Sequence, residues 1–193
     1  YATGSEWRDE PLFTQNAPLK CGKGSAYEGG IREPMIVSWP GVTEPGSRCD
    51  DYVIAEDYYP TILEMAGVTE YKAPQAIDGV SFVPYLKKNG KPSDGRSLYW
   101  NCPNLWGEDG PGIGPTCTVR KGDWKLIYFY ETGKKELYNI PNDIGENNNL
   151  VSEYPALVKE LSENLGQYLR KVGAQRPSLK ATGKPVPWPD EVD

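Results

Sequence analysis

Hydrophobic residues in the first half of the chain form three short segments separated by polar loops. Residues 34–41 are an almost continuous apolar run ending in Pro-Gly, which predicts a strand buried on both faces of an α/β sheet. Residues 53–68 follow a helical period, with Asp57 as the expected N-cap. The predicted apolar face of this helix consists of Tyr59, Ile62, Leu63 and Ala66. Residues 81–88 predict a second, shorter helix capped by Ser81.

The second half of the chain has a different pattern. Runs of β-branched and aromatic residues predict four strands, at residues 96–101, 116–121, 123–130 and 135–140. Short links containing glycine predict that the last three strands form an antiparallel meander. A helical period returns over residues 153–172, and its apolar stripe should lie across the small sheet. The stripe contains Leu157, Val158, Leu161, Leu165, Tyr168, Leu169 and Val172. The proline-rich residues 176–193 predict an extended strap over the surface.

A change in composition predicts where the chain divides. Residues 91–96 are rich in turn-forming residues, and strands replace helices beyond them. We expect residues 1–95 to be the end of an α/β domain. Residues 96–193 should form a smaller subdomain with an antiparallel sheet, the helix 153–172 and an extended tail. The predicted fold class is therefore α/β, with an α+β C-terminal part.

The charge balance and the lengths of the apolar runs each exclude one class of partner. The chain has 193 residues, 21 basic and 27 acidic, with a formal net charge of −6, which gives no broad cationic surface for nucleic acid. No apolar run approaches the roughly 20 residues that span a bilayer, so no membrane partner is predicted. The polar start at Tyr1, without an initiator Met, predicts that the segment begins inside a loop of a longer protein.

Several kinds of site are excluded by residue type. The four cysteines, Cys21, Cys49, Cys102 and Cys117, lack Cys-x-x-Cys spacing, and the chain has no histidine, so neither a zinc site nor a Ser-His triad is predicted within it. Disulfides and free thiols both remain open for these cysteines. Adjacent carboxylates occur in loops, where they are usually solvated, and no complete metal site is predicted.

The candidate chemistry centres on a lysine between two glycines. Lys23 lies between Gly22 and Gly24, and a Glu-Gly-Gly-Ile-Arg sequence follows it. Glycines let the backbone approach a ligand without side-chain obstruction. The pattern matches neither nucleotide-binding glycine motif, so no nucleotide site is predicted. Glu28 and Arg32 are expected to form an ion pair that holds the intervening Gly-Gly turn.

Four segments together resemble the C-terminal part of a type I sulfatase of the arylsulfatase kind. They occur at residues 18–41, 57–68, 78–87 and 119–150, and the resemblance extends from Pro18 to Gly173. It implies a fold similar to alkaline phosphatase. A large α/β domain carries the nucleophile and calcium, and a smaller four-stranded antiparallel sheet packs with a long helix. The resemblance also implies export to the periplasm, a lysosome or the extracellular space.

The resemblance further implies that most of the active site lies outside this chain. Family enzymes use a formylglycine made within Cys-x-Pro-x-Arg or its serine equivalent. The sequence at Cys117 has Val119 and Lys121 in place of the Pro and Arg, so Cys117 is not the expected nucleophile. The formylglycine and most calcium ligands should lie upstream of Tyr1. The chain alone is then expected to be inactive, with the upstream part of its catalytic domain as a partner.

The resemblance assigns candidate roles to three residues. Lys23 corresponds to a lysine that contacts the sulfate group. Residues 99–110 resemble a stretch in which histidines lie near the leaving group, and Asn101 and Asn104 stand in their places here. Asparagine can hydrogen-bond a polar leaving group such as a sugar but cannot transfer protons near neutral pH. The alternative for this stretch is a structural loop with Trp106 packed inward.

The leading interpretation is a segment of an enzyme that hydrolyses sulfate esters of a small molecule or glycan. A non-catalytic carbohydrate-binding module is a second candidate, because 13 tyrosines and 6 tryptophans offer faces on which sugar rings stack. A relative that cleaves phosphate esters on the same scaffold is a third.

Overall fold

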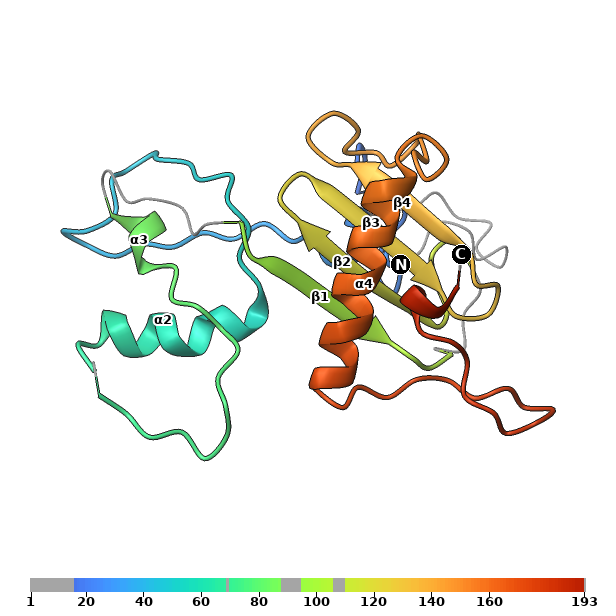
Figure 1. Ribbon diagram of the computed structural model, residues 1–193. Helices are drawn as coiled ribbons and strands as arrows, with labels where there is room; N and C mark the ends of the chain where they lie inside the picture. The colour runs from blue at the N-terminus through green and yellow to red at the C-terminus, as the bar shows by residue number, and fades with distance from the viewer. Residues whose placement is uncertain (1–15, 69, 88–94, 106–109, 193) are drawn as a thin grey trace, which may run out of the picture. The chain divides into compact units, whose positions relative to one another are not determined.

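A computed structural model describes residues 16–68, 70–87, 95–105 and 110–192. The chain divides into two compact units, of which the first contains Tyr1–Glu33 and Gly95–Asp193 and the second contains Pro34–Asp94 (Figure 1). The second unit ends at Asp94, and the domain division predicted after residue 95 stays a prediction. However, the segment that carries Lys23 belongs to the same unit as the antiparallel sheet. Composition cannot reveal this arrangement, because it depends on contacts between residues about a hundred positions apart.

The first unit is built on a four-stranded antiparallel sheet. Its strands are β1 Ser97–Cys102, β2 Thr116–Lys121, β3 Trp124–Phe129 and β4 Lys135–Asn139. They lie in the order β1-β2-β3-β4, so each strand pairs with its neighbour in sequence. Ser97 of β1 pairs with Lys121 of β2, and Lys121 pairs in turn with Trp124 of β3. The predicted strands and meander are therefore confirmed. Gly122, at φ +55°, closes the tight β2–β3 connection in a conformation that favours glycine.

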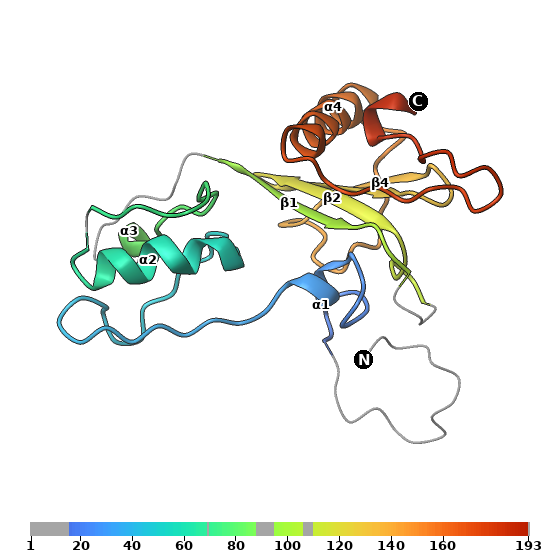
Figure 2. The same ribbon diagram turned by 90° about the horizontal axis from the view of Figure 1, so that it is seen from below.

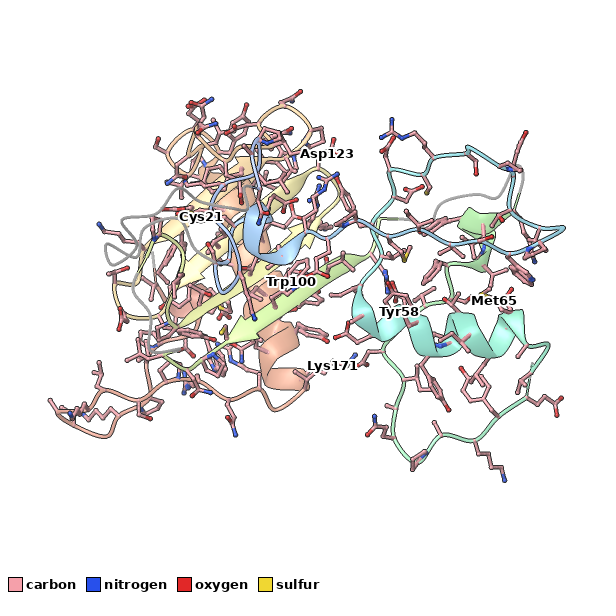
Figure 3. All side chains as sticks on the ribbon, turned by 180° about the vertical axis from the view of Figure 1, so that it is seen from behind. Cys21, Tyr58, Met65, Trp100, Asp123 and Lys171 are labelled. Atoms are coloured by element: carbon pink, nitrogen blue, oxygen red, sulfur yellow. The ribbon has the colours of Figure 1, made fainter. Side chains whose placement is uncertain are left out.

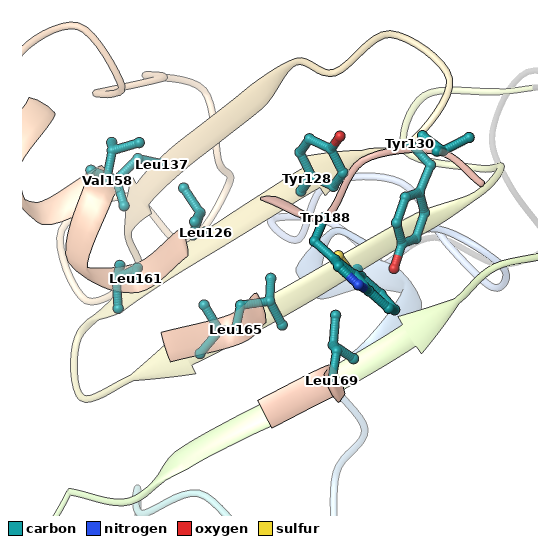
Figure 4. Close-up of a cluster of buried hydrophobic side chains, with 12 residues drawn as sticks. Leu126, Tyr128, Tyr130, Leu137, Val158, Leu161, Leu165, Leu169 and Trp188 are labelled. Atoms are coloured by element: carbon teal, nitrogen blue, oxygen red, sulfur yellow. The ribbon is translucent and has the colours of Figure 1, made fainter. Parts of the chain in front are cut away.

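One face of the sheet is covered by the long helix α4, Pro155–Lys171. Figure 2 shows α4 on this face and the short helix α1, Glu28–Ile31, on the other. The helix buries Val158, Leu161, Leu165 and Leu169 of the predicted stripe against inward residues of the strands, as Figure 4 shows. Val172, the last predicted member, follows the helix and is 46% exposed. The most deeply buried leucines are Leu126, Leu137, Leu161, Leu165 and Leu169, each no more than 1% exposed. Burial of each stabilises the fold by about 1.5–3 kcal/mol.

The opposite face of the sheet is covered by the segment from residue 16 to Glu33. Figure 3 looks onto this face, where Cys21 marks the covering segment. A second apolar cluster forms here, from Ala26, Tyr27, Ile127, Tyr138 and Ile140. Two buried charged residues also point toward this segment: Arg120 from β2 and Lys125 from β3. Both faces of the sheet are thus buried, one by a helix and one by a mostly irregular segment.

The C-terminal tail is more deeply packed than predicted. It contains an isolated bridge between Ser178 and Pro185 and a short 3-10 helix, η2, Pro189–Glu191. Trp188 is only 7% exposed and belongs to the core under α4. Arg170 of α4 makes ion pairs with Asp190 at 2.7 Å and with Glu191 at 2.9 Å. The tail therefore completes the hydrophobic core instead of only crossing the surface.

The second unit contains η1 Ala55–Asp57, α2 Tyr58–Met65 and α3 Val83–Leu86. Asp57 is the N-cap residue of α2, as predicted, although its carboxylate serves other groups. It accepts hydrogen bonds from the backbone N–H of Ile54 at 3.0 Å and of Val80 at 2.9 Å. The predicted apolar face of α2 is largely exposed, with Tyr59 at 51% and Ile62 at 60%. The buried side instead holds Asp57, Pro60 and Thr61.

The predicted strand at residues 34–41 is wrong for the described structure. These residues are extended or turning but belong to no strand, and Ile36 is 96% exposed. An apolar run becomes a strand only when neighbouring backbone supplies hydrogen bonds. Among the residues that the structure describes, no strand pairs with this segment.

Candidate functional site

Lys23 lies at the tip of a tight turn. The backbone N–H of Ser25 donates to the carbonyl oxygen of Gly22 at 3.1 Å, which closes a turn with Lys23 and Gly24 at its central positions. Gly24 has φ +91°, a conformation that side chains of L-residues rarely adopt. The Lys23 side chain is exposed, whereas Gly22 and Ser25 are buried. The turn therefore presents the lysine outward from a buried base.

The base of this turn rests on the two glycines of α1. A Cβ added to Gly30 would lie 2.1 Å from the carbonyl oxygen of Ser25 and 2.7 Å from that of Gly22. A Cβ added to Gly29 would lie 2.3 Å from the carbonyl oxygen of Cys21. Backbone contacts backbone here, so any larger residue would push the lysine turn away from α1.

Glu28, the residue before these glycines, is 2% exposed and joins α1 to the sheet. Its carboxylate lies 3.0 Å from the Lys125 Nζ of β3 and 3.3 Å from an Arg120 guanidinium nitrogen of β2. The predicted ion pair with Arg32 also forms, at 3.6 Å, but the Arg32 side chain is 41% exposed. The buried contacts with Arg120 and Lys125 are therefore the stronger ones.

Glu146 completes the buried charge cluster. It is fully buried, and its carboxylate lies 2.9 Å from the Lys125 Nζ and accepts a hydrogen bond of 2.6 Å from the backbone N–H of Glu28. Burial raises the pKa of Glu146, and the charge of Lys125 partly offsets that shift. The backbone carbonyl of Glu146 also accepts a hydrogen bond from Lys20 Nζ at 2.9 Å. Glu28 and Glu146 balance Arg120 and Lys125 in charge.

Tyr27 adds an aromatic contact to this anchoring. The Lys20 ammonium lies 3.9 Å from the centre of the Tyr27 ring, a cation–π distance. The Tyr27 hydroxyl donates to a Glu136 carboxylate oxygen at 2.8 Å, as does the Tyr138 hydroxyl. Burial, followed by the neighbouring carboxylate, raises the pKa of Tyr27 and of Tyr138. The phenols therefore stay protonated as donors.

A second loop is hydrogen-bonded to the Lys23 segment. The backbone N–H of Ala26 donates to the Gly112 carbonyl at 2.9 Å, and the Ser25 hydroxyl donates to the Pro111 carbonyl at 3.0 Å. Gly112, at φ +70°, has no room for a Cβ beside Ser25 and Tyr27. The end of the loop between β1 and β2 is thus fixed against the residues that follow Lys23.

The two candidate asparagines lie in different surroundings. Asn101 is on the face of the sheet that carries α4, where its side chain accepts from the Tyr130 hydroxyl at 2.9 Å and donates to the Gln175 carbonyl at 2.8 Å. This is the face opposite to the Lys23 segment. Asn104 is exposed in the β1–β2 loop. The structure therefore does not bring Asn101 together with Lys23. Trp106, the centre of the structural alternative for this loop, lies outside the described residues.

The four cysteines are thiols in this structure. Cys117 is fully buried on β2, and burial raises the pKa of its thiol to about 12. This environment agrees with its exclusion as a nucleophile. Among the described residues, no group of three or more Cys, Asp or Glu side chains is arranged to hold a metal ion. A search of the same residues finds no helix long and apolar enough to cross a membrane.

The fold and the lysine segment together define a C-terminal sulfatase domain. Residues 22–173, which extend from the lysine turn to the end of α4, match the family described as N-sulphoglucosamine sulphohydrolase, C-terminal. The chain belongs to the sulfatase family and represents its C-terminal portion.

Named relatives support this membership. A sulfatase from Formosa agariphila is 34% identical over 190 residues, covering 91% of this chain and 34% of the relative. An N-acetylglucosamine-6-O-sulfatase from Bacteroides thetaiotaomicron is 31% identical over 161 residues, covering 81% of this chain and 28% of the relative. A crystal structure of Ps i-CgsB in complex with k-i-k-neocarrahexaose has a TM-score of 0.67 at 30% identity, covering 85% and 34%. The chain spans about a third of the length of these relatives.

Sequence reasoning found the lysine turn, its glycines and the Glu28–Arg32 pair but missed Arg120, Lys125 and Glu146. A weak signal exists for one of them. Lys125 interrupts the apolar run of β3, and a charged residue in a buried strand requires a partner. That signal cannot identify the partner, which comes from another part of the chain.

Proposed function

We propose that this chain is the C-terminal part of an enzyme that hydrolyses sulfate esters and that Lys23 contacts the sulfate group. The observation that carries the proposal is an exposed lysine on a turn whose base is buried and anchored through Glu28 to the sheet. This turn lies within the residues that match the sulfatase family. An ammonium group held in one place is suited to binding an anionic group.

The chemistry of sulfate esters explains why a fixed cation is useful. A sulfate ester carries one negative charge, and negative charge develops on the bridging oxygen as the S–O bond breaks. An ammonium group already in place stabilises this charge without reorganising during the reaction. A flexible lysine would lose much of this effect, because it would have to be ordered in each turnover.

The nucleophile and the metal belong to other residues in this proposal. The sequences around the four cysteines do not fit a formylglycine site. Among all the residues that the structure describes, no group of side chains is arranged to hold a calcium ion. Formylglycine would supply the nucleophile, and calcium, when bound, would supply positive charge for the sulfate oxygens. Lys23 would then complete a site whose other groups lie outside the chain.

The partner proposed for the chain is the upstream part of its own catalytic domain. Most of the exposed large apolar residues in the described part of the chain lie in the second unit, and such a concentration is typical of a face covered by another part of a protein. Its exposed large apolar residues are Met35, Ile36, Tyr58, Tyr59, Ile62, Val68, Tyr71 and Val80. Such a cover would also supply backbone partners for residues 34–41.

The proposed substrate is a sulfated carbohydrate. One relative is named an N-acetylglucosamine-6-O-sulfatase, and a structural neighbour was solved with a neocarrahexaose. Asn104, exposed in the loop whose far end is fixed beside Ser25, is proposed to contact the sugar on the leaving-group side. Both ends of the Asn101 amide are hydrogen-bonded within the chain, and its predicted substrate contact stays a prediction.

The test is Lys23→Ala in the full-length protein, assayed with an aryl sulfate and with sulfated oligosaccharides. We expect turnover to fall by about two to three orders of magnitude, the size of effect seen when a group that hydrogen-bonds the negative charge of a transition state is removed. The melting temperature should stay nearly unchanged, because the side chain is exposed.

The matched control is Lys134→Ala, which removes an exposed lysine that follows a glycine in the β3–β4 turn. It should leave turnover intact. Near-normal turnover of Lys23→Ala would exclude the sulfate contact. Export, implied by the family resemblance, is tested separately by locating the protein in fractionated cells.

A further inference from the structure

We propose that Glu28, Lys125 and Glu146 are positioning residues that hold Lys23 in its working place. The inference rests on the proposed sulfate contact of Lys23. It adds that the accuracy of this contact is set by a buried charge cluster on the sheet, not by the turn itself. None of these three side chains needs to touch the substrate.

The position of the lysine turn depends on α1. Within the turn, one hydrogen bond joins Ser25 to Gly22. Outside the turn, the Ser25 hydroxyl donates to the Pro111 carbonyl. On the side of α1, the Ser25 and Gly22 carbonyls closely approach Gly30, and the Cys21 carbonyl closely approaches Gly29. These contacts leave no space for adjustment, so a shift of α1 moves the turn with it.

The position of α1 depends in turn on the charge cluster. This helix has only four residues, and it has no side-chain cap at its N-terminus. The Glu28 carboxylate binds Lys125 and Arg120, while its backbone N–H donates to Glu146. Side chain and backbone of one residue are thus both attached to the first unit's other elements, immediately before the two glycines.

The charges of this cluster fix the position of α1. A buried ion pair often contributes no more stability than apolar residues of similar shape, so stability alone does not explain this cluster. Its members lie on three separate parts of the chain, and each acid contacts Lys125. Charged groups without partners in a dry interior are costly, so only one placement of α1 satisfies all of them. The cluster therefore selects a single position for α1 and, through it, for Lys23.

Lys20 attaches the residues before the turn to Glu146 as well. Its Nζ donates to the Glu146 backbone carbonyl at 2.9 Å, and its carbonyl accepts from the Gly29 N–H at 3.0 Å. Residues on both sides of Lys23 are thus attached to Glu146, one through Lys20 and one through Glu28. Lys23 lies at the tip of a segment held at both ends.

The test is a double-mutant cycle on kcat/KM in the full-length protein, with Glu28→Gln, Lys23→Ala and both together. If Glu28 acts through Lys23, Glu28→Gln should lower kcat/KM by about tenfold to a hundredfold, the range expected for a small misplacement of a catalytic group. In the Lys23→Ala background, the same change should alter kcat/KM less than about threefold, because no lysine remains to be misplaced.

The control is Asp190→Asn, which weakens the ion pairs with Arg170 under α4, on the other face of the sheet. It should leave kcat/KM unchanged in both backgrounds. If Glu28→Gln is without effect, or lowers kcat/KM by the same factor with and without Lys23, the positioning role is overturned. If Lys23→Ala alone has normal kcat/KM, the proposed function itself fails, and the inference fails with it.

A second variant keeps the inference testable if Glu28→Gln does not fold. Glu146→Gln retains an oxygen that can accept from the Glu28 N–H but removes the charge beside Lys125. The same cycle should again be non-additive with Lys23→Ala. An effect that multiplies equally in both backgrounds would show that Glu146 acts on the amount of folded enzyme and not through the lysine.

Discussion

The Glu146 carboxylate accepts a hydrogen bond of 2.6 Å from the backbone N–H of Glu28, across 118 residues of sequence. Through this contact and the shared ion pairs with Lys125, the loop after β4 and the segment carrying Lys23 become parts of one structure. The Gly-Lys-Gly turn therefore depends on residues distant in the sequence, namely Lys125 of β3 and Glu146 after β4.

Lys125→Met should destabilise the protein strongly. The substitution keeps an unbranched side chain that is one atom shorter, but it leaves Glu28 and Glu146 buried without their shared cation. Removing one partner of a buried pair costs about 3–5 kcal/mol. Urea unfolding of the full-length protein measures the change. Lys121→Met is the control, since Lys121 makes an exposed ion pair with Glu160, and it should have a much smaller effect. Equal effects of the two variants would contradict the account of the cluster.

Gly30→Ala should lower activity through the position of the lysine turn. The added methyl group would lie 2.1 Å from the Ser25 carbonyl oxygen, so the turn and α1 must separate. We expect kcat/KM to fall by about tenfold or more, as for other small displacements of a catalytic group. Gly183→Ala in the tail is the control: it forces an L-residue to φ +65° but meets no atom within 4 Å. If both variants have the activity of the parent enzyme, the turn does not rest on Gly30 as described.

Cys117 should resist thiol reagents in the folded protein, while Cys49 and Cys102 react. Cys117 is fully buried and its pKa is about 12, whereas the other two are exposed. Alkylation at pH 8 followed by peptide mapping measures this difference. Unfolding in urea before labelling is the control, and it should make Cys117 as reactive as the others. Modification of Cys117 in the native protein would contradict its place in the core.

The same thiol predicts how stability depends on alkaline pH. The folded pKa of Cys117 is raised to about 12 from an ordinary value of 9.0, so the unfolded chain loses this proton first as the pH rises. The folded state then binds more protons than the unfolded state, and stability falls between about pH 9 and about pH 12. Cys117→Val, compared with the parent by urea unfolding at each pH, should show a shallower decline. An identical decline would assign the effect to other groups, such as Tyr128, whose pKa is raised to about 12 by burial.

The chain of residues 1–193 should not hydrolyse aryl sulfates by itself, whereas the full-length protein should. The residues that the structure describes hold no metal cluster, and the one cysteine with a partial resemblance to the nucleophile motif is buried. A purified preparation of the chain and its Lys23→Ala variant are assayed side by side. Turnover that disappears with Lys23→Ala would show that the chain carries a complete site, contrary to the proposal.

Much of the first unit was predictable because its signals are local. The four strands and α4 follow from the period of apolar residues and from turn glycines, which act within a few positions. Residues 34–41 show where this reasoning fails. Their apolar composition predicts a strand, but a strand forms only with neighbouring strands, and the described structure provides none for them. The predicted apolar face of α2 fails for a similar reason, because the described structure leaves Tyr59 and Ile62 more than half exposed.

The sequence by itself determined the elements of the sheet and helix, the lysine turn and the family resemblance, since each depends on neighbouring residues or on the order of short motifs. Only the tertiary structure decided that Arg120, Lys125 and Glu146 support the Lys23 segment and that Asn101 lies on the other face. The physical reason is that a charged residue in a strand has several possible partners. Which one it meets depends on how the chain returns to the sheet, here after 92 residues for Arg120 and 97 for Lys125.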